Sequence, residues 1–329
     1  MHEKPPSIES EKSFLDNWIE TEFNREYDEQ ARILQKLQLM DLLPDSEKMG
    51  IRGIDGNEYP LPSKKDIIAE IKRDPGKYEM KIKRGFTKIQ FTPFALPLER
   101  LIMVLEYELL DHHKRGKLFR PKENPNDPDV AVDLDSTMPI DIWSDIIDRN
   151  DPEGKRGADV TNRCLYHITS FSQKHGGRTK IKILKTQNNS PFSGWEIKLL
   201  APNPNKPKKW FKTDNLFDRV TASGKIDIPL DFLKLLQDKT QYRHEQGLTL
   251  EDWLTEFLVH LEQTNQVIND DVKGNQCPLI GSFYPERNSV CRGSWGSRSS
   301  KAHIGLLRAN DSNKYKYFRH TAVPVDPKL

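Results

Sequence analysis

The stretch Thr249-Leu-Glu-Asp-Trp-Leu-Thr-Glu-Phe-Leu-Val-His-Leu261 carries the clearest structural signal in the chain. Thr249 can cap a helix, and Asp252 stands three residues later, where it completes a capping box. Apolar residues then recur at the spacing of one helix face: Leu250, Trp253, Leu254, Phe257, Leu258 and Leu261. The pattern predicts a helix over residues 249–263 with a buried face that contains Trp253 and Phe257.

Helical patterns also dominate the N-terminal third. Residues 14–37 place apolar side chains at helical spacing, a second pattern starts after Ser63, and a third follows Pro97. Ser63 has an acid three residues later, as in a capping box. We therefore expect a mainly helical region over residues 1–120.

Two segments in the middle alternate apolar and charged residues, as half-buried strands do. They are residues 179–183 and residues 195–199, and we expect their charged side chains to face solvent. Strands and helices together predict an α+β fold in which residues 121–329 form a mixed globular unit.

Composition narrows the class of protein. The chain has 329 residues, enough for about two domains. Apolar residues make up 35% and charged residues 30%, and the mean hydropathy is −0.74. The most apolar window, residues 98–110, contains charged residues, which excludes a membrane span there. The three cysteines form no C-x-x-C pair and no secretory signal is visible, so we expect a cytoplasmic protein.

Charge is balanced overall but uneven along the chain. There are 51 basic and 49 acidic residues. Residues 121–151 are acidic, whereas residues 171–186, 206–212 and 286–320 are basic and contain or adjoin aromatic residues. Basic blocks with aromatic residues suit single-stranded nucleic acids, which makes nucleic-acid binding the second functional hypothesis.

Motifs for common cofactors are missing from the sequence. Neither a P-loop, nor a dinucleotide-binding glycine pattern, nor a G-x-S-x-G element occurs, so we expect no cofactor. His112 and His113 are adjacent on a helix and point about 100° apart, which argues against one shared metal ion. We therefore predict no metal site. Cys164 has His167 nearby in sequence, but a lone cysteine is typically buried.

Glu196 and Lys198 form an E-x-K pair on a predicted strand. In metal-dependent nucleases such a strand presents a carboxylate to Mg²⁺ while the lysine stabilises developing charge. These sites need a second acid a short way upstream, and residues 171–193 contain none. Glu196 and Lys198 are thus the only catalytic candidates, and a nuclease is the third functional hypothesis.

The C-terminus carries the most specific pattern. Val290-Cys-Arg-Gly-Ser-Trp295 is followed by an apolar patch ending at Arg308, then by Tyr317-Phe-Arg319 and a short apolar strand. This order resembles the closing segment of the formylglycine-generating-enzyme, or sulfatase-modifying-factor, branch of the C-type-lectin-like fold. The resemblance implies a lectin-like lobe over about residues 277–329, and no family is indicated for residues 1–276.

The resemblance implies binding rather than catalysis. Those enzymes use a cysteine pair after this segment, and no cysteine follows Cys291 here. We expect a non-catalytic binding or interaction protein, whose partner is a protein or a small ligand. The expected structural anchors are Arg292, Gly293, Trp295 and Arg319. The expected binding residues are Ser297, Arg298, Ser299, Lys301, Asn310, Asn313, Tyr315 and Tyr317, because loops rich in such residues form adaptable contact surfaces.

Overall fold

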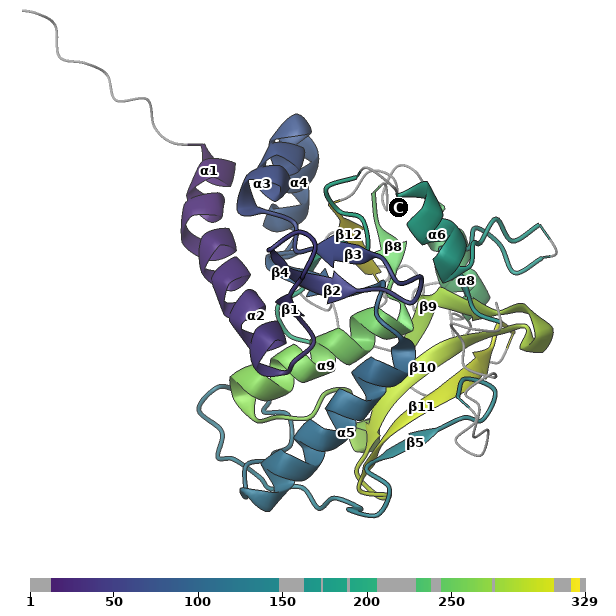
Figure 1. The fold of residues 1–329 in the computed structure, drawn as a ribbon. Coiled ribbons are helices and arrows are strands. Elements are labelled where there is room, and N and C mark those ends of the chain that lie inside the picture. Colours follow the sequence, from purple (N-terminus) through teal and green to yellow (C-terminus); the bar gives the residue numbers. More distant parts are fainter. Residues whose placement is uncertain are drawn as a thin grey trace, which may run out of the picture.

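The computed structural model describes residues 13–147, 163–172, 174–187, 190–205, 229–237, 244–273, 276–310 and 321–325. Its fold is α+β, as the sequence predicts. Helices lie mostly on one side of the molecule, and the long C-terminal strands lie on the other (Figure 1). No helix among the described residues is long and apolar enough to cross a membrane.

The predicted N-terminal helices are confirmed, including the cap of the second pattern. Ser63 Oγ accepts a hydrogen bond from the backbone N–H of Asp66 at 3.2 Å. The helices of the described residues are α1 (Phe14–Trp18), the π-helix η1 (Ile19–Phe23), α2 (Asn24–Lys36), α3 (Lys64–Arg73), α4 (Pro75–Lys83), α5 (Leu98–Lys114), α6 (Lys180–Thr186), α8 (Pro229–Leu236), α9 (Leu250–Thr264), and the 3₁₀ turns η2 (Asp271–Lys273) and η3 (Pro285–Arg287).

Three sheets are present in the described part of the chain. The first is an antiparallel meander of β1 (Asp41–Leu42), β2 (Met49–Arg52) and β3 (Glu58–Pro60). The second has the order β4 (Lys88–Thr92), β7 (Glu196–Leu200), β12 (Thr321–Pro324) and β8 (Gln246–Gly247). The third has the order β5 (Ile140–Ile142), β11 (Lys301–Arg308), β10 (Ser289–Gly296), β9 (Cys277–Tyr284) and β6 (Leu165–Tyr166).

Helix α9 is the centre of the molecule. Its capping box is formed as predicted: Thr249 Oγ1 accepts from the Asp252 N–H, and the Thr249 N–H donates to Asp252 Oδ2 at 2.8 Å. Every residue from Leu250 to Leu261 is buried, not only the predicted face. The reason is that α9 packs against α2 and α5 and against strands β4, β9 and β10. Trp253 and Phe257 are both 0% exposed, as expected.

One hydrophobic core runs from Leu15 to Val325 and includes residues on either side of residue 120. Helix α9 links the two parts of this core because its buried residues touch the N-terminal helices and the C-terminal sheet. The proposed separation into residues 1–120 and 121–329 stays a prediction.

The predicted strand over residues 179–183 is wrong. The chain forms helix α6, and Thr179 caps it by accepting from the Lys182 N–H. The apolar residues Ile183 and Leu184 and the stem of Lys180 lie on one buried helix face. The alternation over residues 179–183 therefore did not distinguish a strand from a helix, because it fits the start of α6 equally well.

Gly293, one of the expected structural anchors, allows a strand and a helix to pack closely. It lies inside strand β10, and a Cβ atom there would be 2.3 Å from the Trp253 ring. Its missing side chain therefore allows β10 to pack closely on α9.

Candidate ligand pocket

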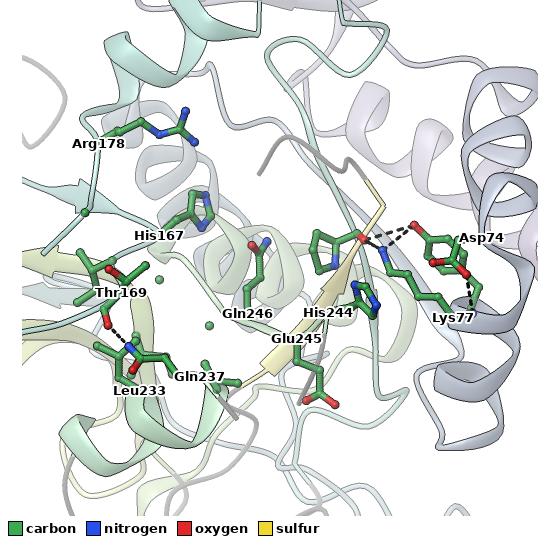
Figure 2. A pocket seen from close by; sticks show the side chains of 18 of the residues that line it. Asp74, Lys77, His167, Thr169, Arg178, Leu233, Gln237, His244, Glu245 and Gln246 are labelled. Atoms are coloured by element: carbon green, nitrogen blue, oxygen red, sulfur yellow. Dashed lines mark hydrogen bonds between the residues drawn. The ribbon is translucent and has the colours of Figure 1, made fainter. Parts of the chain in front are cut away.

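A pocket of about 720 Å³ opens where the start of α4, the loop after β6, the end of α8 and strands β8, β9 and β12 meet. Figure 2 shows His167, Arg178 and Gln246 along one side of it, with Asp74 and Lys77 on the right. Concave sites that mix apolar walls with a few polar groups are typical of small-molecule binding.

His167 follows β6 directly and has an unusual backbone. Its φ of 55° lies in the left-handed region, which residues other than glycine rarely adopt. Its N–H donates to the carbonyl of Gly281 at 3.1 Å, which ties the loop to β9. The side chain is only 10% exposed and lines the pocket. Backbone strain of this kind is concentrated at functional sites, which makes His167 the leading site residue.

The two ring nitrogens of His167 have different surroundings. Nε2 lies 2.7 Å from Oε1 of the fully buried Glu196. An ionised carboxylate only accepts, so Nε2 carries a proton. Nδ1 is buried and has no hydrogen-bond partner among the described residues. An unpaired buried polar atom costs free energy, which a ligand bonded to Nδ1 would recover.

Behind His167 lies a set of ionised side chains, Glu196, Lys198 and Asp252, which we call the buried charge network. All three are 0% exposed, and the Lys198 ammonium donates to Glu196 Oε2 and Asp252 Oδ2. Thr92 Oγ1 donates to Asp252 Oδ1 at 2.7 Å. Burial alone would raise the pKa of Glu196, but the charges of Lys198 and His167 outweigh it and lower this pKa to about 2. Glu196 is therefore ionised and holds the His167 ring in place.

The same network corrects the expectation that Glu196 and Lys198 face solvent. They are fully buried because Asp252, at the start of α9, neutralises Lys198 from the opposite side. Asp252 also supplies the second acid that a nuclease site needs and that residues 171–193 lack. However, the Lys198 ammonium bonds to both carboxylates, where a nuclease would hold its metal ion. A bound Mg²⁺ ion retains several water ligands, which the fully buried surroundings of Glu196 and Asp252 do not favour.

Two cationic side chains at the pocket bond only to neutral groups within the described residues. Arg178 donates to Thr186 Oγ1 at 3.2 Å. Lys77 donates to the Pro324 carbonyl at 3.1 Å, and burial lowers the pKa of its ammonium. The amide nitrogen of Gln246 is buried and has no partner among the described residues. These three groups are donors that a ligand could use.

The acidic side chains at the pocket already have partners. Glu70 pairs with Arg73 at 2.7 Å, and Glu245 pairs with the fully buried Lys81 at 2.8 Å. Asp74 caps α4 by accepting a backbone N–H at 3.1 Å. The hydrogen-bond donors that remain in the pocket therefore suit a ligand with negatively charged acceptor atoms.

Four of the binding residues predicted at the C-terminus, Ser297, Arg298, Ser299 and Lys301, lie at the turn between β10 and β11, and several of them take part in internal bonds. Asn310 follows the far end of β11. Ser297 Oγ donates to Asp270 Oδ1 at 2.8 Å, and Ser299 Oγ lies 2.5 Å from His303 Nε2. Lys301 pairs with Asp135 at 2.8 Å. Ser297, Ser299 and Lys301 are half-buried, whereas Arg298 and Asn310 are exposed. Asn313, Tyr315, Tyr317 and Arg319 lie outside the described residues.

The other expected anchors are parts of strand β10. Trp295 is 0% exposed, as expected, and its backbone N–H donates to the Asn269 carbonyl at 2.9 Å. Arg292 is half-buried and donates to Gln276 Oε1 at 3.2 Å. Neither residue lines the pocket.

Comparison of this chain with protein-family models, curated proteins and solved structures gave no match. The function must therefore be argued from the geometry alone.

Sequence reasoning missed the pocket residues His167, Arg178 and Gln246. They come from separate segments and share no motif spacing, so no sequence signal could have grouped them. His167 drew notice only as a neighbour of Cys164. That cysteine is 3% exposed and packs in the core, so the two do not form an accessible pair.

Proposed function

We propose that this protein binds a small anionic ligand, carrying a phosphate or carboxylate group, in the pocket beside His167. The observation that carries the proposal is the His167 ring, whose Nε2 is held by ionised Glu196 while Nδ1 has no partner among the residues that the structure describes. A ligand anion at Nδ1 would favour the protonated ring. Both nitrogens would then donate, one to Glu196 and one to the ligand.

The rest of the pocket supports an anion. Arg178 and Lys77 bring positive charge that no described carboxylate neutralises by direct ion pairing. The guanidinium of Arg178 can bond two oxygens of one phosphate or carboxylate. The Gln246 amide adds a donor without charge. Ile168, Leu233 and Ile280 supply apolar surface for the remainder of the ligand.

This proposal keeps the ligand-binding role expected from the sequence and moves its location. The turn after β10 uses much of its polar capacity internally. In the part of the pocket that the structure describes, the Gln246 amide nitrogen has no partner and Arg178 bonds only to a neutral hydroxyl. The resemblance to the formylglycine-generating-enzyme branch of the C-type-lectin-like fold stays a prediction about the C-terminal segment.

Nucleic-acid binding is less favoured because one basic block does not form a continuous basic surface. Within residues 171–186, Lys180 is 2% exposed and its ammonium pairs with Glu251 at 2.9 Å. A nucleic acid needs several adjacent phosphate contacts on an open surface.

The test is calorimetric titration of the whole protein with inorganic phosphate, nucleoside monophosphates and di- and tricarboxylic acids. We expect at least one compound to bind at one site per chain. His167→Gln and Arg178→Gln should each weaken that binding by about tenfold or more, because each removes a charged hydrogen bond.

The matched control is Lys174→Gln, an exposed cation in the same loop that does not line the pocket. It should leave the affinity unchanged. Failure of every compound to bind, or equal binding by wild type and the His167 and Arg178 variants, would overturn the proposal. Preferential binding of a single-stranded oligonucleotide that both variants retain would favour the nucleic-acid hypothesis.

A further inference from the structure

Away from the pocket, three side chains with metal-ligand chemistry meet where the C-terminal ends of α5 and α9 lie side by side (Figure 1). They are Glu108 and His112 on α5 and Glu262 on α9, and we call them the helix-end cluster. One ligand atom from each lies within 4.8 Å of the others. Their side chains are only 11%, 9% and 6% exposed.

The hydrogen bonds of His112 determine what its ring offers to the cluster. Nδ1 lies 3.3 Å from the carbonyl of Lys117, which can only accept, so Nδ1 carries the proton. Nε2 lies 3.3 Å from Glu262 Oε1, and a metal ion bound there would take the place of the proton that these two atoms share. Metal-bound histidines are oriented in this way, by a bond from the other ring nitrogen to a carbonyl or carboxylate.

Glu262 has the Lys36 ammonium as its ion-pair partner, whereas Glu108 has no lysine or arginine partner within the described residues. The C-terminal ends of two helix dipoles add partial negative charge. Each of these features favours a cation at the centre of the cluster.

The spacing fits a particular class of cation. Ligand atoms about 2.0–2.2 Å from a tetrahedral metal ion lie about 3.3–3.6 Å from each other. His112 Nε2 is 3.3 Å from Glu262 Oε1 and 3.9 Å from Glu108 Oε2. One nitrogen and two oxygen ligands, with a fourth position left for water, match zinc and similar divalent transition metals.

We propose that Glu108, His112 and Glu262 bind a divalent transition metal ion, Zn²⁺ being the best fit. Glu262 would use Oε1 for the metal and keep Oε2 on Lys36, which already bonds to it. The Lys36 side chain is 51% exposed, so this side of the cluster lies near the protein surface. None of the three ligands lines the pocket beside His167, so this proposal does not depend on the proposed function.

The sequence contained part of this signal. Glu108 and His112 are four residues apart and share a helix face, which is the spacing of paired ligands on a helix. The prediction of no metal site compared His112 with its neighbour His113 and overlooked Glu108. The third ligand lies 150 residues from His112, where only the packing of α5 on α9 could reveal it.

The experiment uses full-length protein treated with a chelator and then titrated with Zn²⁺ against a competing indicator. We expect one zinc ion per chain, with an affinity that falls about tenfold or more in His112→Asn and in Glu262→Gln. Circular dichroism confirms that each variant is folded. Glu108→Gln, which keeps size and shape, serves if either of the others fails to fold. Co²⁺ should give the visible absorption of a tetrahedral site in wild type only.

The matched control is His113→Asn, because His113 is the next residue on α5 and its side chain is exposed. It should bind Zn²⁺ as wild type does. Absence of stoichiometric Zn²⁺ binding by wild type, or binding unaffected in all three ligand variants, would overturn the proposal. The cluster would then hold shared protons instead of a metal ion.

Discussion

The buried charge network and the helix-end cluster both place carboxylates in the interior beside α9, yet they treat the carboxylates in opposite ways. In the network, the Lys198 ammonium bonds to both Glu196 and Asp252, and the pKa of Glu196 is lowered to about 2. In the cluster, Glu108 faces Glu262 and a histidine, and its pKa is raised to about 7.

The difference shows that burial alone does not decide the charge of an internal acid. Glu196 is 0% exposed and therefore more deeply buried than Glu108, but it has a full positive charge in contact. Desolvation raises the pKa of both groups, and beside Glu196 the charges and hydrogen bonds of Lys198 and His167 outweigh it. In the network the lysine bonds to both carboxylates, whereas in the cluster Lys36 bonds to Glu262, and Glu108 lacks a lysine or arginine partner within the described residues.

The largest expected effect comes from removing the cation of the network. Lys198→Met would leave Glu196 and Asp252 buried beside each other without a counter-charge. We expect the free energy of unfolding to fall by about 3–5 kcal/mol, as for other buried ion pairs that lose one partner. Urea denaturation measures this change. Lys185→Met on exposed α6 surface is the control, and a loss below 1 kcal/mol for Lys198→Met would show that the network is not essential.

Glu196→Gln should have the next largest effect. The folded pKa of Glu196, about 2, lies below that of an unfolded glutamate. Its ionisation therefore stabilises the fold above pH 4.5, and this contribution disappears as the pH falls from 4.5 to 2. We expect a loss of roughly 2–3 kcal/mol at pH 7. Stability curves across this pH range should be less steep for the variant, and parallel curves would contradict the assignment.

Glu108→Gln should act in the opposite direction. The folded pKa of about 7 lies above the unfolded value, so stability is lost as the pH rises from 4.5 through 7. In chelator-treated protein, the neutral amide should therefore raise the free energy of unfolding by about 1 kcal/mol at pH 8 and have little effect at pH 5. Glu286→Gln, at an exposed acid, is the control. If Glu108→Gln instead lowers the free energy of unfolding at pH 8, nearby positive charge already compensates the ionised carboxylate of Glu108.

Local signals in the sequence were sufficient for the helical part of the fold. Capping residues such as Ser63 and Thr249 act on backbone groups two or three residues away, so their effect is visible in a short window. Trp253 and Trp295 were placed in the core correctly because their size makes exposure costly.

Partners distant in the sequence account for what could not be predicted. Lys180 reads as a solvent-facing residue, but its ammonium bonds to the Leu96 carbonyl and to Glu251. Lys198 is buried because its ammonium bonds to Asp252, which lies 54 residues away in the sequence. His167 likewise becomes a site residue only when Glu196 holds one nitrogen and the pocket lies beside the other. Each case depends on tertiary packing, which residue spacing does not encode.

The smallest effect is expected for Lys36, the lysine that pairs with Glu262 of the helix-end cluster. Lys36 pairs with Glu262 as Lys198 pairs with Glu196, but the Lys36 side chain is 51% exposed. Water already solvates its ammonium, so Lys36→Ala should cost no more than about 0.5 kcal/mol at low salt, and less at high salt. Thermal or urea denaturation of Lys36→Ala, Glu262→Gln and the double variant gives the coupling energy of the pair. A coupling as large as the loss in Lys198→Met would mean that exposure of the lysine does not set the strength of these pairs.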